Sequence, residues 1–444
     1  MVSEESTQLI TNNQPLITQK IMSTRRGFIK STGALALFAA GLGGVPSFIA
    51  RAANSNKILS PYKKNKKLVC IFQRGAMDGL MAVTPFTDEY LKAARPTLFM
   101  SAAKGSSSNP LIDLDGRFGL HPSMKAFEPL FREKRLGIVH AVGSPNSTRS
   151  HFDAQDYMES GTPFNKGTNT GWLNRAVGLL GHEAATPFQA VSITSSLPKS
   201  FYGDNASLAI NNLQDFAIQM RGNPMVANMA AKSFEDLYDQ TSSSLLNKTG
   251  KESFEAVKML KKADTKNYKP ANGAVYPDNQ IGNSLKQIAQ LIKMDVGLEV
   301  AFTECGGWDT HYNQGTETGA FSRNVADLSN AITAFWTDLA AYQDEVTLMT
   351  MTEFGRTVKQ NGTAGTDHGR GSCLFILGND VNGGIVHGNM PILAKENLED
   401  GRDVPVTTDF RSVFSEVADT HLKINDDRIL FPEWDGKKIG VMRA

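Results

Sequence analysis

Short runs of consecutive apolar residues alternate along this chain with stretches of helical periodicity. The runs are five to eight residues long and lie at 68–72, 136–143, 188–193, 298–303, 346–351 and 373–378. Runs of this length without alternation are typical of strands buried on both faces of a parallel sheet. Helices are expected at about 120–133, 154–159, 283–294 and 321–342, and from 407 through 421. Strands that alternate with helices predict the α/β class, with a three-layer α/β/α arrangement around a mostly parallel central sheet.

The stretch from about 203 to 281 breaks this alternation. It is rich in Met, Asn and Lys, and helical periodicity recurs at 228–245 and 251–262. We expect a helical insertion over an edge of the sheet. It carries no motif for chemistry, and two roles remain open, a wall of a substrate pocket or a packing or oligomer surface.

Composition narrows the class of protein. The chain has 444 residues, of which 41% are hydrophobic and 20% charged, which fits a globular protein with a sizeable core. The formal net charge of +1 gives no reason to expect nucleic acid or an acidic membrane surface as a partner. Recognition of phosphate in a local pocket stays open.

The amino terminus has the pattern of an export signal. Thr24-Arg25-Arg26-Gly27-Phe28-Ile29-Lys30 is typical of a twin-arginine signal, an apolar Gly/Ala-rich run follows at 33–49, and Ala50-Arg51-Ala52 fits a cleavage site. The run is short and interrupted, which disfavours the alternative of a membrane anchor. We therefore expect a signal peptide at 1–52, a single domain at 53–444, and a periplasmic or secreted protein that meets the export machinery and has no stable membrane span after cleavage. Met22 is an alternative start.

The three cysteines, Cys70, Cys305 and Cys373, lie in or next to apolar runs and form no C-x-x-C pair. This pattern indicates buried thiols, with one disulfide bridge as the alternative. It excludes a cysteine-based zinc knuckle.

Polar residues suited to metal binding gather where the predicted strands end. They are Asp78 after the first run, Asp309 and His311 after the run at 298–303, Glu353 after the run at 346–351, and Asp367 and His368 before the run at 373–378. Loops at one edge of an α/β sheet are where such folds place ligands. We expect these side chains to converge on a divalent ion, zinc, manganese or calcium, that activates a water or a hydroxyl. For Asp78 a helix N-cap is the simpler interpretation.

Three further residues are candidates for catalysis. Ser150 stands in a hydroxyl-rich loop before a predicted helix, where it is either a cap or a nucleophile. Arg74 and Arg356 follow two of the strands, and a guanidinium fork matches the oxygens of phosphate or sulfate. Their alternative role is a structural ion pair with Glu353 or Asp78. Trp308 is expected to pack in the core.

Several short motifs of the sequence resemble those of a known family. They are QRGAMDGL, SHFDAQDYMESG, GGWDTHYNQ, MTEFGRTVKQNG and GTDHGRGSCLFILG, and they are similar to those of the domain-of-unknown-function 1501 family, exported proteins placed in the alkaline phosphatase-like and sulfatase-like superfamily. The resemblance spans nearly the whole mature chain. It implies an alkaline phosphatase-like fold.

The resemblance also implies roles for individual residues. Asp78 resembles the superfamily's metal-binding aspartate after the first strand, and Asp309 with His311 resembles its central pair, with one intervening residue in place of three. Glu353-Phe354 stands where the superfamily has an Asp-His pair, which leaves His368 as the terminal histidine. In the other alignment Asp367-His368 is that pair, and the terminal histidine is His387 or His421. The formylglycine motif of sulfatases is not clearly present.

The function implied is an exported metal-dependent hydrolase that acts on a small anionic ester of phosphate or sulfate. The alternative is a non-catalytic envelope protein that keeps the fold for binding or assembly. A third idea, a transferase similar to phosphoglycerate mutase, fits poorly with export.

Overall fold

The structure is a computed structural model that describes residues 65–103, 109–182, 184–213 and 268–443. The expected signal peptide and the helical stretches at 228–245 and 251–262 lie outside these residues. Among the described residues, no helix is long and apolar enough to cross a membrane.

The described residues form one nine-stranded sheet. Its strands are β1 (Lys67–Gln73), β5 (Leu136–Gly143), β6 (Ala190–Ile193), β7 (Leu208–Ala209), β8 (Val300–Cys305), β9 (Val346–Met351), β10 (Ser372–Gly378), β11 (Val386–His387) and β12 (Thr408–Asp409). They stand in the order β11-β5-β10-β9-β1-β8-β6-β7, and β12 pairs with β5. All six apolar runs that predicted strands are strands of this sheet, within two residues at each end.

Strand β10 runs against the rest of the sheet. It pairs antiparallel with both β5 and β9, whereas the other pairings in this sheet are parallel. The loop that precedes β10 therefore lies at the same edge as the loops that follow β1, β5, β8 and β9. We call this edge the carboxyl rim.

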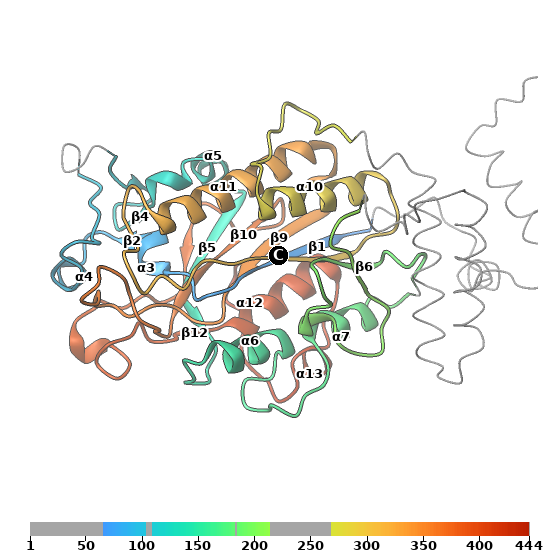
Figure 1. Cartoon of the computed structure of the whole chain (residues 1–444). Helices are drawn as coiled ribbons and strands as arrows, with labels where there is room; N and C mark the ends of the chain where they lie inside the picture. Colours follow the sequence, from blue (N-terminus) through green and yellow to red (C-terminus); the bar gives the residue numbers. More distant parts are fainter. Residues whose placement is uncertain (1–64, 104–108, 183, 214–267, 444) are drawn as a thin grey trace, which may run out of the picture. The chain divides into compact units, whose positions relative to one another are not determined.

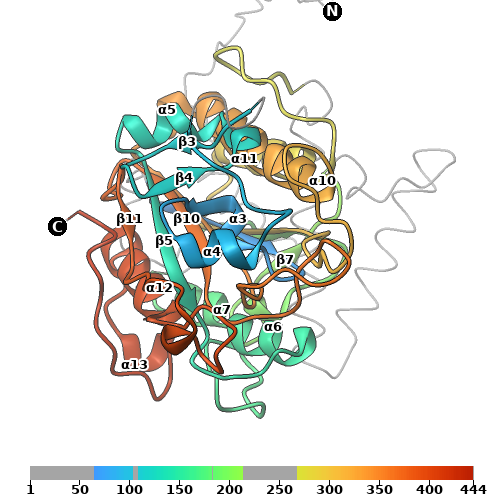
Figure 2. The same ribbon diagram turned by 90° about the vertical axis from the view of Figure 1, so that its left-hand side faces the viewer.

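Helices cover both faces of the sheet, as Figures 1 and 2 show from two directions. On one face lie α5 (Phe127–Arg132), α10 (Gln280–Lys293) and α11 (Ala320–Asp338), and on the other lie α6 (His151–Ser160), α7 (Trp172–Gly178), α12 (Phe410–Val417) and α13 (Asp427–Leu430). Side chains of β1 alternate between the two cores, with Val69 and Ile71 in one and Leu68, Cys70 and Phe72 in the other. Burial on both faces explains the unbroken apolar runs. The three-layer α/β/α prediction is confirmed.

Several predicted helices are shorter or broken. The helix expected at 120–133 is a 3-10 turn at Pro122–Met124 followed by α5, and the helix expected through 421 is α12 followed by a π turn at Ala418–Leu422. The stretch 88–119, to which the sequence pattern assigned no strand or helix, holds α4 (Glu89–Ala94) and, with β2 (Val83–Pro85), a small sheet of β2, β4 (Phe118–Leu120) and β3 (Ile112–Asp113). Strands of two or three residues are too short to show a period.

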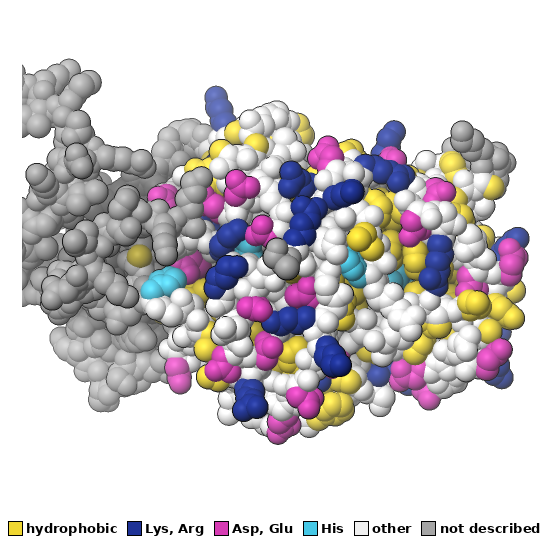
Figure 3. Space-filling model, turned by 180° about the vertical axis from the view of Figure 1, so that it is seen from behind, with side chains coloured by type: hydrophobic (Ala, Val, Ile, Leu, Met, Phe, Trp, Pro, Cys, Tyr) yellow, Lys and Arg dark blue, Asp and Glu magenta, His cyan; other side chains and the backbone are white. Residues whose placement is uncertain are grey.

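The prediction of free, buried thiols is confirmed for Cys70 and Cys373. Cys305 is also a free thiol but is only partly buried. Trp308 is buried and packs edge-on against Phe321. On the face seen in Figure 3, basic and acidic side chains are interspersed, in keeping with a net charge near zero.

Candidate metal centre

Three histidines and an aspartate from three segments of the chain lie close together at the carboxyl rim. His151 is the first residue of α6, which follows β5. Asp309 and His311 lie in the loop after β8, and His368 lies in the loop before β10. Their side chains remain partly open to solvent, between 22% and 45% exposed, so an ion or a small molecule has access.

The ligand atoms of these residues lie close together. Nε2 of His368 is 2.9 Å from Nε2 of His151, 2.9 Å from Nε2 of His311 and 3.2 Å from Oδ1 of Asp309. The carboxylate of Asp309 also lies 3.0 Å from Nε2 of His311 and 3.5 Å from Nε2 of His151. His151, Asp309 and His368 qualify together as a candidate metal-binding group, and His311 contacts two of its members.

The other ring nitrogen of each histidine is bonded to an acceptor. Nδ1 of His151 lies 2.8 Å from Oε1 of Glu353, Nδ1 of His311 lies 2.9 Å from Oδ1 of Asp367, and Nδ1 of His368 lies 2.8 Å from the carbonyl oxygen of Arg149. An acceptor at Nδ1 keeps the proton there and leaves a lone pair on Nε2. This is the way metal-binding histidines are usually oriented in proteins.

Three lone pairs and a carboxylate that face one another repel unless a cation lies between them. Ligand atoms around a tetrahedral zinc ion stand about 3.3 Å apart, given Zn–N bonds of about 2.0–2.1 Å. The distances among the ligand atoms of His151, Asp309 and His368, 2.9–3.5 Å, fit that spacing. Imidazole nitrogen with one carboxylate suits zinc or manganese better than calcium, which prefers oxygen.

Arg356 holds the aspartate in place. Its Nη1 donates to Oδ1 of Asp309 at 2.7 Å, and its Nη2 donates to the carbonyl of Thr366. Burial opposes ionisation of Asp309, but this ion pair outweighs it and keeps the pKa of Asp309 below its usual range. The carboxylate is therefore charged and ready to bind a cation. The fork of Arg356 is used up, which corrects the prediction that it holds an anionic substrate.

The surroundings of His151 and His368 shift the pKa values of the two imidazoles in opposite directions. The hydrogen bond to Glu353 raises the pKa of His151, while burial lowers the pKa of His368. Without a metal ion, His151 is therefore protonated more readily than His368. Burial would raise the pKa of Glu353, but its hydrogen bonds, first that from His151, keep it low.

Glu353 and Asp367 are placed behind the ligands instead of among them. Glu353 is fully buried, and its Oε1 also accepts from the backbone N–H of Gly75 at 2.8 Å and from Nε2 of Gln155 at 2.9 Å. Asp367 accepts from Asn361 as well as contacting His311. Both were predicted as ligands; in the structure Glu353 contacts Nδ1 of His151 and Asp367 contacts Nδ1 of His311. Phe354, next to Glu353, packs against the rings of His151 and His368.

The loops that carry the ligands are packed backbone against backbone. The N–H of Thr366 donates to the carbonyl of Thr310 at 3.1 Å, and Nδ2 of Asn361 donates to the carbonyl of His311 at 2.8 Å. A Cβ on Gly365 would lie 2.2 Å from the carbonyl oxygen of His311, so only glycine fits there.

Asp78 is not brought into this cluster, which corrects its assignment as a metal ligand. It is 1% exposed, and its oxygens accept from Nη1 and Nη2 of Arg95 at 2.7 and 3.1 Å and from Nε2 of Gln314 at 2.7 Å. Both oxygens are thus engaged in a buried ion pair. Asp78 precedes the short helix α3 (Gly79–Ala82) without a side-chain capping bond.

The two remaining catalytic candidates also lie at the rim. Arg74 donates to Oε2 of Glu304 at 2.6 Å and pairs with Glu159 at 2.9 Å, so its guanidinium is already matched by two carboxylates. This corrects its prediction as an anion holder. Ser150 is exposed, stands at the N-cap position of α6 directly before His151, and makes no side-chain capping bond.

Sequence reasoning missed His151 as a candidate ligand. The signal was present, because this histidine follows a predicted strand at the same rim and begins the next helix. Its place in the hydroxyl-rich loop drew attention to Ser150 instead.

The profile of the family described as "Protein of unknown function (DUF1501)" matches residues 65–430 of the chain. A comparison with curated proteins found no match. Among solved structures, the zinc complex of the C-terminal periplasmic domain of EcEptC from Escherichia coli is 10% identical, with a TM-score of 0.32 over 72% of this chain and 74% of that one.

Two other solved structures are similarly distant. Alkaline phosphatase from the Antarctic bacterium TAB5 is 11% identical, with a TM-score of 0.30 over 71% of this chain and 92% of that one. The PsFucS1 sulfatase from Pseudoalteromonas sp. is 10% identical, with a TM-score of 0.36 over 89% and 78%. Scores below 0.5 are too low to assign an activity to this chain.

Proposed function

Because the chain belongs to the DUF1501 family, whose description names no activity, we propose from the geometry of its rim that it is a metal-dependent hydrolase of phosphate or sulfate esters. We further propose that it is exported by the twin-arginine route and works in the periplasm or outside the cell, on the strength of residues 24–52.

One observation carries the hydrolase proposal. The ligand atoms of His151, Asp309 and His368 lie 2.9–3.5 Å apart, His311 contacts two of them, and Nδ1 of each histidine is bonded to an acceptor. This arrangement fits a divalent ion, zinc or manganese in our proposal. When bound, the ion would supply a Lewis acid and favour loss of a proton from a water or hydroxyl.

The chain's own residues would divide the remaining work. His151, His311, His368 and Asp309 hold the site together, and Arg356 fixes the carboxylate of Asp309. Ser150 is our candidate nucleophile, because its hydroxyl lies at a helix N-terminus beside a ligand, where developing negative charge is favoured. A water is the other candidate. Neither Arg74 nor Arg356 has a free fork for the ester oxygens.

The test is metal content followed by turnover. Protein folded in the cell is expected to carry about one zinc or manganese ion per chain by elemental analysis, and Asp309→Ala and His368→Ala are expected to lose it. His182→Ala, at the opposite edge of the sheet, serves as the control and should keep it. Aryl phosphates and aryl sulfates then report activity, with Ser150→Ala separating a serine nucleophile from water.

The outcomes separate the two candidate functions. Hydrolysis of an ester that disappears with the ion supports the proposal. A bound ion with no turnover of any ester would favour the alternative, a non-catalytic binding or assembly protein of the cell envelope. Absence of any ion from the wild-type protein would contradict both the site and the hydrolase.

A further inference from the structure

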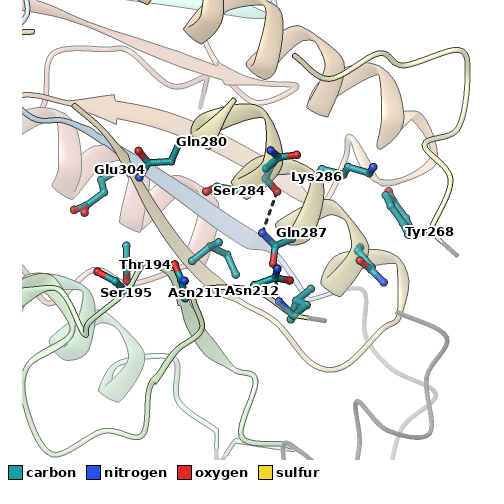
Figure 4. A pocket seen from close by; sticks show the side chains of 14 residues that line it. Thr194, Ser195, Asn211, Asn212, Tyr268, Gln280, Ser284, Lys286, Gln287 and Glu304 are labelled. Atoms are coloured by element: carbon teal, nitrogen blue, oxygen red, sulfur yellow. Dashed lines mark hydrogen bonds between the residues drawn. The ribbon is translucent and has the colours of Figure 1, made fainter. Parts of the chain in front are cut away.

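A polar cavity lies farther along the same carboxyl rim, at the ends of β6, β7 and β8. Thr194 and Ser195 follow β6 directly, Asn211 follows β7, and Glu304 belongs to the end of β8. In Figure 4, Thr194, Ser195 and Asn211 lie below the α10 residues Gln280 and Ser284, and Glu304 lies beside Gln280. Its volume of about 530 Å³ is within the usual range for small-molecule sites.

The lining of this cavity is dominated by hydroxyl and amide groups. The charged side chains on its walls are Lys286 and Glu304, which are opposite in sign and stand toward opposite ends in Figure 4. An anionic ligand would need an excess of positive charge, and an apolar ligand would leave the amides without partners. The cavity therefore suits an uncharged ligand with many hydrogen-bonding groups.

Several of these polar groups have no partner of their own. Ser284 is only 5% exposed, yet within the described part of the chain its hydroxyl forms no hydrogen bond. The side chains of Ser195, Asn211 and Gln280 are exposed and likewise bond to no described residue. The hydroxyl of Ser284 is not among the fully buried unpaired atoms of the described residues, so it is accessible from the cavity, where a ligand or water completes its bonding.

We propose that this cavity binds an uncharged saccharide. Amides and hydroxyls both donate and accept, as do the neighbouring hydroxyls of a sugar, so the two sets pair without any change of charge. Tyr268 closes one end with a ring that is fixed, because its hydroxyl donates to the buried Asp338 at 2.5 Å. The assignment of the saccharide as the alcohol part of the ester rests on the proposed hydrolase function.

A chain of hydrogen bonds joins the cavity to the metal centre. Glu304 accepts from Nε of Arg74 at 2.6 Å, and Nη1 of Arg74 donates to Gln155 at 3.0 Å. Gln155 donates at 2.9 Å to Glu353, which contacts His151 at 2.8 Å. The cavity and the metal centre are thus neighbouring parts of one rim.

The test measures binding separately from turnover. Metal-loaded wild-type protein is titrated with neutral disaccharides of glucose, galactose and N-acetylglucosamine by calorimetry and ligand-observed NMR. At least one is expected to bind, and Ser284→Ala should weaken that binding about fivefold to tenfold, the effect of one hydrogen bond. Asn211→Ala, at an exposed loop position that tolerates substitution, should weaken it similarly.

A matched control distinguishes the cavity from general destabilisation. Ser322→Ala removes another buried helical hydroxyl, one that has partners in Ser123 and Glu317, and it should leave saccharide binding unchanged. Failure of every disaccharide to bind, or binding unaffected by both cavity variants, overturns the saccharide site. If a saccharide binds but no ester is hydrolysed, the saccharide site stands and the hydrolase proposal is rejected. If an ester is hydrolysed but no saccharide binds, the hydrolase proposal stands and the saccharide site is rejected.

Discussion

At the scale of single residues, the proposed centre depends as much on what lies behind the ligands as on the ligands. Glu353, Asp367 and the Arg149 carbonyl each fix the proton of one imidazole on Nδ1. Such outer partners raise the basicity of the ligand and fix the orientation of its ring. Glu353 is the most buried of the three and the one least replaceable by water.

Glu353→Gln is therefore expected to lower metal affinity about 10- to 100-fold although no ligand is removed. Chelator competition measures the affinity. Glu299→Gln is the matched control, because Glu299 pairs with His182 at 2.7 Å far from the rim, and it should change nothing. Equal affinity in the wild type and Glu353→Gln would show that the carboxylate has no part in the site.

Asp78→Asn is expected to lower the stability of the fold without changing metal binding. It leaves the guanidinium of Arg95 buried without its counter-charge, which should lower the free energy of unfolding by about 3–5 kcal/mol. Metal stoichiometry should remain that of the wild type. Urea unfolding and elemental analysis check the two effects, and loss of the ion from folded Asp78→Asn would restore Asp78 as a ligand.

The sequence located this site only in part. Asp309, His311 and His368 could be placed at the rim because each lies next to an apolar run that becomes a strand. The partner of Asp78 could not be found, since Arg95 lies 17 residues away in a stretch without a period. The partners of Arg74 and Arg356 could not be found either, because the sequence does not distinguish an arginine that pairs with a carboxylate from one that binds a substrate.

At the scale of secondary-structure elements, the reversal of β10 decides where His368 lies. A parallel β10 would place the loop 365–368 at the opposite edge, far from Asp309. Apolar runs predicted the existence of the strands well, but neither their order nor their direction follows from such runs. The short strands β2, β3 and β4 left no readable pattern at all.

The two ligand loops must also touch, and Gly365 permits this. Gly365→Ala would push its Cβ against the carbonyl of His311 at 2.2 Å, which should separate the loops and lower metal affinity at least tenfold. Gly362→Ala is the matched control in the same loop, because a Cβ there meets nothing within 4 Å. Similar metal affinity in the two variants would contradict this role of the loop contact.

At the scale of the whole molecule, two buried histidines outside the candidate metal centre are expected to lower stability in acid. Burial lowers the pKa of both His121 and His140 from 6.5 to about 4. Nδ1 of His121 accepts the backbone N–H of Ser123, and Nδ1 of His140 accepts that of Ala141. Protonation of either Nδ1 would break this hydrogen bond. Between pH 6.5 and pH 4 the unfolded chain binds protons that the folded chain does not.

Stability is therefore expected to be full above pH 6.5 and to fall as the pH drops toward 4, by about 3 kcal/mol for each histidine. His140→Gln removes one of these contributions. The difference in unfolding free energy between the wild type and His140→Gln should shrink by about 3 kcal/mol from pH 7 to pH 4, as measured by urea unfolding at each pH. A difference that stays constant with pH would contradict the assignment.

The separation of the ligands along the chain has a consequence for when the ion arrives. His151 and His368 are 217 residues apart, and their Nε2 atoms meet only after β10 has inserted between β5 and β9. The four proposed donors are spread over residues 151–368, so we expect an ion to be captured in the proposed centre only after this segment has folded. We therefore predict that the divalent ions available where the chain folds determine which ion occupies the proposed centre.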